Sequence, residues 1–246
     1  MTALVLSAGG MYGAYQAGAW KALAGRLRPD LVVGASVGAL NAWAIAGGVP
    51  PEELIASWLE PDMARLASIR LQPPWKGCLD SRPLHARIQR LCGSCRPQVS
   101  IAVVATELPA LRPRIFRDGA ITWRHLAASC AVLLGYEQIR IGGKLYSDGG
   151  LLGALPLWVA AELGATQIVA VNALPAMPSI TVRTVVRAIR AVAPDRPHAS
   201  GRSLDLRMIA PPGPLGPVRR AIFWDRTAVE SWIARGEADA GRVDLE

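Results

Sequence analysis

Short apolar runs alternate with longer stretches of helical character along most of the chain. Runs of strand length bounded by Gly or Pro are typical of buried strands, and longer stretches with capping residues are typical of helices. The predicted strands are residues 2–7, 30–33, 99–105, 113–116, 167–171 and 204–209, with a hairpin over 139–146. The predicted helices are residues 13–24, 37–46, 51–59, 81–91, 123–129, 156–163, 180–192 and 227–235.

Strands that alternate with helices in this way are typical of an α/β fold. The chain has 246 residues, which is long enough for one sizeable core, and neither an internal repeat nor a break in composition marks a boundary. Polar or proline-rich loops are expected over 70–80, 194–202 and 211–217. We therefore expect one three-layer α/β domain over residues 1–246, with a mainly parallel central sheet flanked by helices.

Residues 31–51 carry no charge, and their length alone would suffice for a membrane span. Glycines and polar residues interrupt the stretch, however, and Pro50-Pro51 closes it. A buried strand that runs into a buried helix explains the same residues, and we favour this interpretation over a transmembrane helix.

The chain carries 27 basic and 19 acidic residues, for a net charge of +8. This charge favours anionic partners, either lipid headgroups or nucleic acid. Because the arginines are scattered singly, an evenly solvated basic surface is the preferred interpretation, and no nucleic acid partner is expected.

A zinc site would need a second pair beside the C-x-x-C of Cys92 and Cys95, so we expect no metal, no cofactor and a reducing cytoplasm. The first twenty residues contain no Lys or Arg and do not resemble a secretory signal.

Ser36 lies between two glycines in Gly34-Ala35-Ser36-Val37-Gly38, at the junction of a predicted strand and a predicted helix. This arrangement is typical of a nucleophile elbow, where the glycines allow a sharp turn that exposes the serine hydroxyl. The helix dipole and the N–H of Val37 would favour negative charge that develops there. Ser36 is therefore the candidate nucleophile of an acyl-transfer reaction.

A second glycine-rich segment, Ser7-Ala8-Gly9-Gly10-Met11-Tyr12-Gly13, also joins a predicted strand to a predicted helix. Its glycines would allow backbone N–H groups to converge on an oxyanion. A dinucleotide phosphate loop occupies the same place in other folds, but its G-x-G-x-x-G pattern fails at Ala8, and only Asp30 could bind a ribose. The loop alone leaves both interpretations open.

A third segment, Asp148-Gly149-Gly150, follows the predicted hairpin, and by itself it could be an ordinary turn. Together, however, the three segments resemble the patatin-like phospholipase family. Residues 4–18 are similar to its glycine-rich oxyanion segment, residues 34–38 to its elbow, and Asp148-Gly149-Gly150 to its D-G-[GA] motif. Weaker similarities at 104–108, 128–131, 209–212 and 236–240 extend the resemblance along nearly the whole chain.

The resemblance implies a serine lipid acyl hydrolase with a Ser–Asp dyad, in which Ser36 attacks an ester carbonyl and Asp148 acts as base. Water would then release the acyl-enzyme. The backbone N–H groups of Gly9, Gly10 and Met11, with that of Val37, would form the oxyanion hole. A free Asp has a pKa of about 4, so the dyad requires that Asp148 be desolvated and hydrogen-bonded to the serine. The other glycines that match the family motifs are Gly13, Gly34, Gly38, Gly149 and Gly150.

Three positions depart from the family pattern. Ala8 replaces a third glycine, Tyr12 replaces a basic residue, and Leu133 stands where the family often has proline. Ala8 tolerates fewer backbone angles than glycine. The change at Tyr12 removes a charge that could lie near the oxyanion or the headgroup. These departures bear on rate and substrate range more than on the class of reaction.

Two other functions remain as alternatives. A Ser–His–Asp triad of the α/β-hydrolase type would need His85, His125 or His198, and only His198 follows Ser36 and Asp148 in the required chain order. The elbow, however, comes after only the second predicted strand. The other alternative is a non-catalytic lipid- or nucleotide-binding module.

Peripheral contact with an anionic membrane is a further expectation. Residues 70–76 and 218–224 mix bulky apolar and basic side chains, which suits such an interface. Loops that pack their Trp side chains against the core would explain the same composition equally well.

Overall fold

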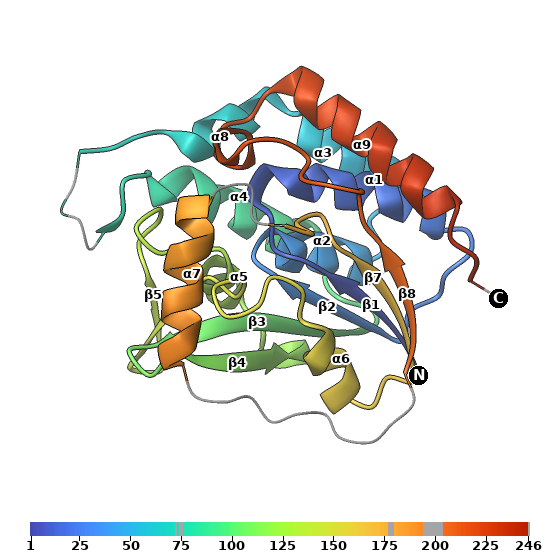
Figure 1. The fold of residues 1–246 in the computed structure, drawn as a ribbon, viewed down its shortest axis with the longest axis horizontal. Coiled ribbons are helices and arrows are strands. Elements are labelled where there is room, and N and C mark those ends of the chain that lie inside the picture. Colours follow the sequence, from blue (N-terminus) through green and yellow to red (C-terminus); the bar gives the residue numbers. More distant parts are fainter. Residues whose placement is uncertain (72, 74–75, 177–179, 194–203, 246) are drawn as a thin grey trace.

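The computed structural model describes residues 1–71, 73, 76–176, 180–193 and 204–245. Within them, one eight-stranded sheet has the strand order β5-β6-β3-β2-β1-β7-β8, and β4 pairs with β3 outside this path (Figure 1). The strands are β1 Thr2–Leu6, β2 Leu31–Ala35, β3 Ser100–Leu108, β4 Arg112–Arg117, β5 Ile139–Ile141, β6 Lys144–Ser147, β7 Gln167–Val171 and β8 Asp205–Ile209.

The neighbouring strands β3, β2, β1, β7 and β8 all run parallel. The strands β4, β5 and β6 add antiparallel pairs at one side of the sheet. The central strands are short and apolar because both of their faces are buried. In β1, Leu4 and Leu6 enter the core on one face, and Ala3 and Val5 enter the core on the other. The expected α/β fold with a mainly parallel sheet is confirmed.

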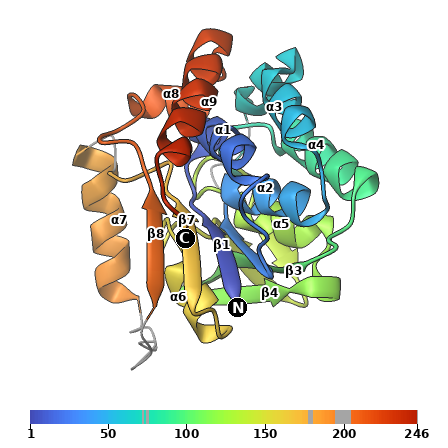
Figure 2. The same cartoon turned by 90° about the vertical axis from the view of Figure 1, so that its right-hand side faces the viewer.

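Helices cover both faces of this sheet (Figure 2). The larger core lies under α1, α2, α4, α5 and α9, whereas α6 packs on the opposite face. The helices are α1 Gly13–Leu23, α2 Val37–Ala46, α3 Pro51–Leu59, α4 Ser81–Ser94, α5 Trp123–Ser129, α6 Leu157–Glu162, α7 Ile180–Val192, α8 Val218–Ile222 and α9 Arg226–Gly241. The 3₁₀ turns are η1 Gly10–Tyr12, η2 Pro61–Ala67 and η4 Asp118–Ala120.

Most element bounds agree with the predicted ones, and the main differences lie near the C-terminus. The helix α9 extends six residues beyond the predicted end at 235, to Gly241, and α8 was not predicted. Glycines within α9 lower its intrinsic helix propensity, but they allow close packing. A Cβ at Gly236 would overlap the carbonyl of Tyr15 in α1, and a Cβ at Gly18 in α1 would overlap the carbonyl of Ile233. Tertiary contact therefore decides where α9 ends.

The uncharged segment 31–51 forms β2 and α2, as expected, and both are buried. In the described part of the chain, no helix combines the length and the apolar character needed to cross a membrane. The loop predicted over 194–202 lies outside the described residues.

Candidate active site

Ser36 occupies a strained turn between the end of β2 and the start of α2. Its backbone angles are φ 55° and ψ −131°, a region that residues other than glycine rarely adopt. The flanking glycines allow this turn because the backbone segments lie very close together. A Cβ at Gly38 would lie 2.5 Å from the carbonyl oxygen of Ser7, and a Cβ at Gly34 would overlap the carbonyl of Gly38. The elbow therefore requires glycine at both positions.

Ser129, at the end of α5, holds the elbow in place. The N–H of Ser36 donates to Ser129 Oγ at 2.9 Å, and Ser129 Oγ donates to the carbonyl of Val104 at 2.6 Å. The carbonyl of Ser129 accepts from the N–H of Gly149 at 3.0 Å. One fully buried residue thus connects the nucleophile to the Asp148-Gly149-Gly150 turn. The sequence analysis included Ser129 only in a weak family similarity, because a single serine in a helix carries no local signal.

Asp148 reaches the same part of the site through the register of the sheet. β3 lies between β2 and β6, with Ala35 opposite Val104 on one side and Ser147 opposite Thr106 on the other. The residues that follow Ala35 and Ser147, namely Ser36 and Asp148, therefore flank the same point of β3. A Cβ at Gly149 would overlap the carbonyl of Val104, so the Asp148 turn, like the elbow, depends on close backbone approach.

The carboxylate of Asp148 is buried and only half satisfied. Its Oδ1 accepts from the N–H of Gly150 at 2.7 Å, and its main-chain carbonyl accepts from Thr106 Oγ1 at 2.9 Å. Its Oδ2 has no hydrogen-bond partner of ordinary geometry among the described residues. Burial raises the pKa of Asp148 to about 6, and the nearby Ser36 hydroxyl and the Gly150 N–H oppose this shift. A carboxylate in this state is a stronger base than a solvated Asp.

The glycine-rich loop brings further N–H groups to the elbow. Within the described residues, the N–H groups of Gly9, Gly10, Met11 and Val37 donate no hydrogen bond. Gly10 has φ 58°, and a Cβ there would overlap the carbonyl of Ala221 in α8, so this position also requires glycine. Of these residues, Gly10, Met11 and Val37 line the same cavity as Ser36.

The remaining motif glycine of this loop, Gly13, and two of the three residues that depart from the family pattern, Ala8 and Tyr12, contribute to packing. A Cβ at Gly13 would lie 2.6 Å from a methyl carbon of Val37, and a Cβ at Gly150 would lie 2.5 Å from that of Ala8. The Tyr12 ring is buried edge-on against Trp232, and its hydroxyl donates to the carbonyl of Pro217 at 2.9 Å. Tyr12 thus connects η1 to the C-terminal segment and does not line the cavity beside Ser36.

A buried polar chain, which the sequence analysis missed, joins the glycine-rich loop to the wall of the cavity. Gln16 Nε2 donates to the carbonyl of Ser7 at 2.6 Å, and Asn41 Nδ2 donates to Gln16 Oε1 at 2.9 Å. Asn41 Oδ1 accepts from Trp58 Nε1 at 3.1 Å. These bonds cross from α1 through α2 to α3. Satisfied buried networks of this kind fix one geometry because breaking any member leaves a buried polar group unpaired.

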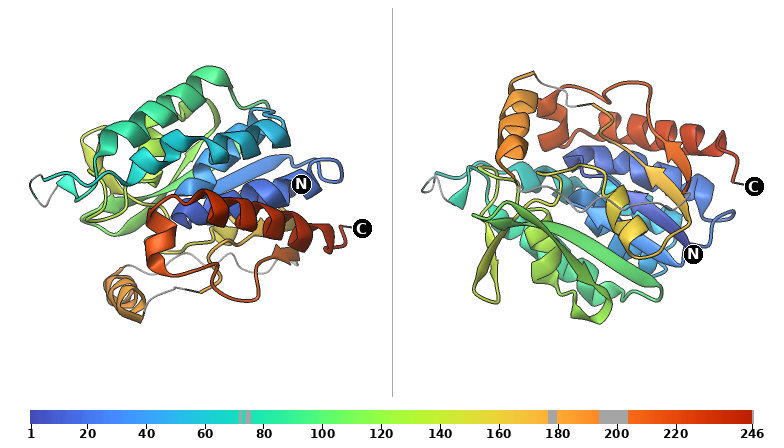
Figure 3. Two further views of the ribbon diagram at one scale, coloured as in Figure 1. Left: turned by 90° about the horizontal axis from the view of Figure 1, so that it is seen from above. Right: turned by 60° about the horizontal axis from the view of Figure 1, so that its bottom comes forward.

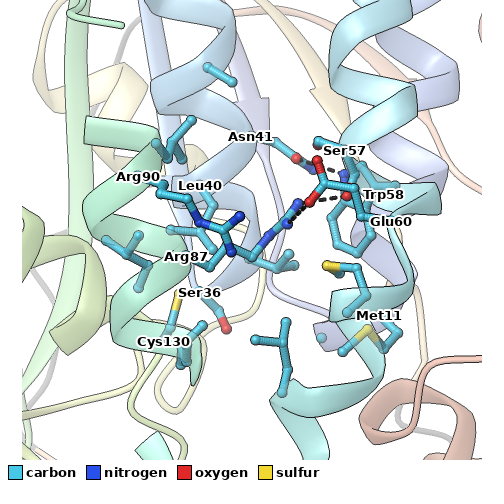
Figure 4. A pocket seen from close by; sticks show the side chains of 18 of the residues that line it. Met11, Ser36, Leu40, Asn41, Ser57, Trp58, Glu60, Arg87, Arg90 and Cys130 are labelled. Atoms are coloured by element: carbon cyan, nitrogen blue, oxygen red, sulfur yellow. Dashed lines mark hydrogen bonds and ion pairs between the residues drawn. The ribbon is translucent and has the colours of Figure 1, made fainter. Parts of the chain in front are cut away.

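An apolar cavity of about 400 Å³ opens at Ser36, between α2, α3, η2 and α4. Figure 4 shows the Ser36 hydroxyl among the side chains that line it. Most of these are apolar, and they include Leu40, Ala44, Leu54, Met63, Leu84 and Ile88. A cavity of this size and polarity suits an acyl chain.

Arg87 crosses the cavity from α4 toward α3. Its guanidinium donates to Glu60 Oε2 at 3.1 Å and to the carbonyl of Ser57 at 2.8 Å (Figure 4). The side chain is 19% exposed, so this bridge is more shielded than a surface ion pair. Arg87 therefore connects the two helices that form opposite walls of the cavity.

The two histidines that the structure describes, His85 and His125, contact residues outside the Ser36–Asp148 pair. His125 Nδ1 accepts from the N–H of Thr122 at 3.0 Å at the start of α5, and the ring of His85 packs against Trp123. In the described part of the chain, no histidine bonds to Ser36 or Asp148. His198 lies outside that part.

Two further sequence hypotheses concern Asp30 and the C-x-x-C pair. Asp30 Oδ2 accepts from the N–H of Thr2 at 2.8 Å, where β1 and β2 begin, so it lies at the opposite edge of the sheet from the glycine-rich loop. This position excludes Asp30 as a ribose-binding acid.

Burial raises the pKa of Cys92 to about 11 and also raises the pKa of Cys95, which makes both thiols unreactive. Within the described residues, no three His, Cys, Asp or Glu side chains gather as a metal site would require.

A patatin-like phospholipase family profile matches residues 4–161, so the chain belongs to the patatin-like phospholipase family. Among solved structures, VipD from Legionella pneumophila is similar with a TM-score of 0.55 at 13% identity, over 97% of this chain and 66% of VipD. The type III effector protein ExoU is similar with a TM-score of 0.45 at 13% identity, over 97% of this chain and 52% of ExoU. The chain thus spans about two thirds of the first and about half of the second. No curated protein matches.

At this identity, VipD supports the fold alone, and the fold agrees with the family. Membership of the family supports lipid acyl hydrolase activity and lipid substrates.

Proposed function

We propose that this protein is a serine lipid acyl hydrolase of the phospholipase A or esterase type, with Ser36 as nucleophile and Asp148 as base. The observation that carries the proposal is the position of Ser36. It lies on a strained elbow, beside a buried carboxylate with a free oxygen, and at the opening of an apolar cavity of about 400 Å³. Family membership agrees with this reaction class.

The reaction begins when Ser36 Oγ adds to the carbonyl carbon of a lipid ester and its proton passes to Asp148 Oδ2. The carbonyl electron pair moves to oxygen, and N–H groups of Gly10, Met11 and Val37 stabilise the oxyanion. When the intermediate collapses, the ester C–O bond breaks and the leaving alkoxide takes the proton from Asp148. Water then repeats the sequence at the acyl-enzyme and releases the carboxylic acid. If an alcohol replaces water in this last step, the product is a new ester.

The cavity determines which part of the substrate lies where. Its apolar walls would hold the acyl chain along α2, while the departing alcohol and its headgroup would lie outside. Because Arg87 bridges α4 and α3 across the cavity, it would shield the bound acyl chain from water. The expected substrates are therefore esters with chains of several carbons.

The test combines covalent labelling with a panel of lipid and p-nitrophenyl esters. A fluorophosphonate should label the native protein at Ser36 but not Ser36→Ala, and Asp148→Asn should lose ester hydrolysis. Ser231→Ala, an exposed serine of α9, is the matched control and should keep both labelling and activity. Absence of labelling at Ser36 would remove the proposal. Loss of activity in His198→Ala as well as in Asp148→Asn would replace the dyad by a triad, and an Asp148→Asn variant that stays active would exclude Asp148 as the base.

A further inference from the structure

A group of exposed aliphatic side chains lies beside the cavity of Ser36. They belong to two loops, and we call them the apolar rim: Ile69, Leu71, Val132, Leu133 and Leu134. Their exposed fractions are 73% for Ile69, 101% for Leu71, 47% for Val132, 38% for Leu133 and 70% for Leu134. Single exposed aliphatic residues are common on soluble proteins, whereas a contiguous group marks an interaction surface.

The two loops form one surface because their backbones bond to each other through residues 77–79. The N–H of Cys78 donates to the carbonyl of Leu134 at 3.0 Å, and the N–H of Leu79 donates to that of Gly135 at 2.9 Å. On the other side, the N–H of Arg70 donates to the carbonyl of Cys78 at 3.0 Å. The rim is therefore built from anchored segments.

Leu134 gives an independent reason to assign a role to the rim. Its φ is 65°, in the left-handed region that a branched side chain adopts at a cost of about 1 kcal/mol or more. The side chain that this conformation carries remains 70% exposed. A strained backbone that holds an apolar side chain in solvent is typical of a functional site, because such strain does not serve the packing of the core.

The rim is continuous with the cavity. Val132 belongs to both, and Tyr136 and Leu66, which line the cavity, are joined by a hydrogen bond of 2.8 Å from the Tyr136 hydroxyl to the Leu66 carbonyl. The parallel strands also run toward the end of the molecule where these loops lie, so their carboxyl edge, with Ser36, faces that end (Figures 1 and 3). An acyl chain leaving a lipid layer at the rim would enter the cavity without crossing water.

The charges near the rim are of both signs, with a basic excess at this end of the molecule. At the edge of the loops, Arg70 Nη1 lies 4.0 Å from Asp80 Oδ1, and Lys76 Nζ lies 3.9 Å from Glu137 Oε1. Figures 1 and 3 place α7 and α8 toward the same end. Among the side chains that the structure describes, these two helices carry four arginines and no acidic residue: Arg187, Arg190, Arg219 and Arg220.

We propose that the apolar rim inserts into the surface of an anionic phospholipid layer and opens the cavity of Ser36 onto that layer. The delivery of lipid to Ser36 rests on the proposed lipid hydrolase function, whereas binding of the rim to the lipid layer does not. Aliphatic side chains beside basic groups are the composition that peripheral membrane proteins use. The segment 70–76, expected from the sequence to dock, contributes Leu71, whereas residues 72, 74 and 75 lie outside the described part. In 218–224, Trp224 instead packs inward and donates to the carbonyl of Trp58 at 3.0 Å.

The experiment is vesicle flotation with Ser36→Ala protein, so that no lipid is hydrolysed. Vesicles of equal parts phosphatidylglycerol and phosphatidylcholine are compared with pure phosphatidylcholine. We expect the Ser36→Ala protein to bind the anionic vesicles. Adding Leu71→Ser/Leu134→Ser to it should lower the partition coefficient about tenfold. The matched control is Leu206→Ser/Met208→Ser, which changes two residues of β8 that are 42% and 41% exposed and should bind as the parent does. Equal thermal midpoints, within about 3 °C, show that all variants fold.

The proposal would be overturned by no flotation of the parent, by unchanged flotation of the rim variant, or by an equal loss in the control variant. A dimer of the parent that the rim variant abolishes would identify a protein interface instead, and would also overturn it. These outcomes are separate from the fate of the proposed function. Flotation does not depend on catalysis, and failure of labelling at Ser36 would leave the binding result intact.

Discussion

Replacing Asp148 by Asn removes a buried negative charge while it keeps almost the same side-chain shape. The carboxyl is buried, and burial raises its pKa from 3.8 to about 6. A shift of this size corresponds to about 3 kcal/mol of unfavourable free energy in the ionised folded state. The Asn side chain can still accept from the N–H of Gly150, and its amide would face the Ser36 hydroxyl. We therefore expect Asp148→Asn to be more stable than the native protein at pH 8 by about 3 kcal/mol, although it is inactive.

The dependence on pH has a definite sign. Because the folded-state pKa is raised, the folded protein holds its proton to a higher pH than the unfolded chain does. The cost of the charge is complete above pH 6, falls as the pH drops through the interval from 6 to 3.8, and disappears below it. The advantage of the variant should thus shrink to less than about 1 kcal/mol at pH 4.

The assay is urea unfolding followed by circular dichroism at pH 8, 6 and 4, with ester hydrolysis measured in parallel. Asp225→Asn is the matched control, since it also removes one negative charge from a basic protein. Asp225 caps α9 by accepting from the N–H of Ala228 at 2.8 Å, and Asn caps helices about as well as Asp, so its stability should hardly change. A variant at position 148 that is less stable than the native protein at pH 8, or whose advantage does not vary with pH, would refute the reasoning.

Three further predictions follow from the site. Hydrolysis of a soluble ester should fall about tenfold for each pH unit below about 6, because Asp148 must be ionised to act as base, and a flat profile from pH 4 to 8 would exclude this role. Gly38→Ala should fail to give folded protein, because its Cβ would lie 2.5 Å from a backbone carbonyl oxygen. Gly93→Ala in α4, where nothing lies within 4 Å, should gain about 0.5 to 1 kcal/mol in urea unfolding, so equal behaviour of the two variants would contradict the packing argument. Ala44→Phe should shorten the cavity and lower activity about tenfold on long-chain esters, with little change on acetyl esters, whereas an equal loss on both would place the acyl chain elsewhere.

Local signals explain why so much of the fold could be predicted. Strands such as β1 and β3 each contain an uninterrupted apolar run, residues 3–6 and 101–105, and α3 begins with Pro51 followed by two acidic residues, so each carries its own signal. The weakly marked elements were the ones that were missed. The helix α8 has five residues, and the last turns of α9 begin at Gly236, which only packing against α1 makes favourable. Local propensity cannot predict such elements because the contacts that stabilise them are distant in the sequence.

The candidate site divides in the same way. The sequence by itself determined the chemistry available: a serine between two glycines, a glycine-rich loop after the first strand, and an Asp-Gly-Gly turn. Only the tertiary structure decided that β3 brings Ser36 and Asp148 together, and that Ser129 connects them. It also decided that Asp148 is buried, that a cavity opens beside Ser36, and that the aliphatic rim remains exposed. Burial, pKa and exposure are properties of the packed chain, because they depend on which residues surround a side chain in space.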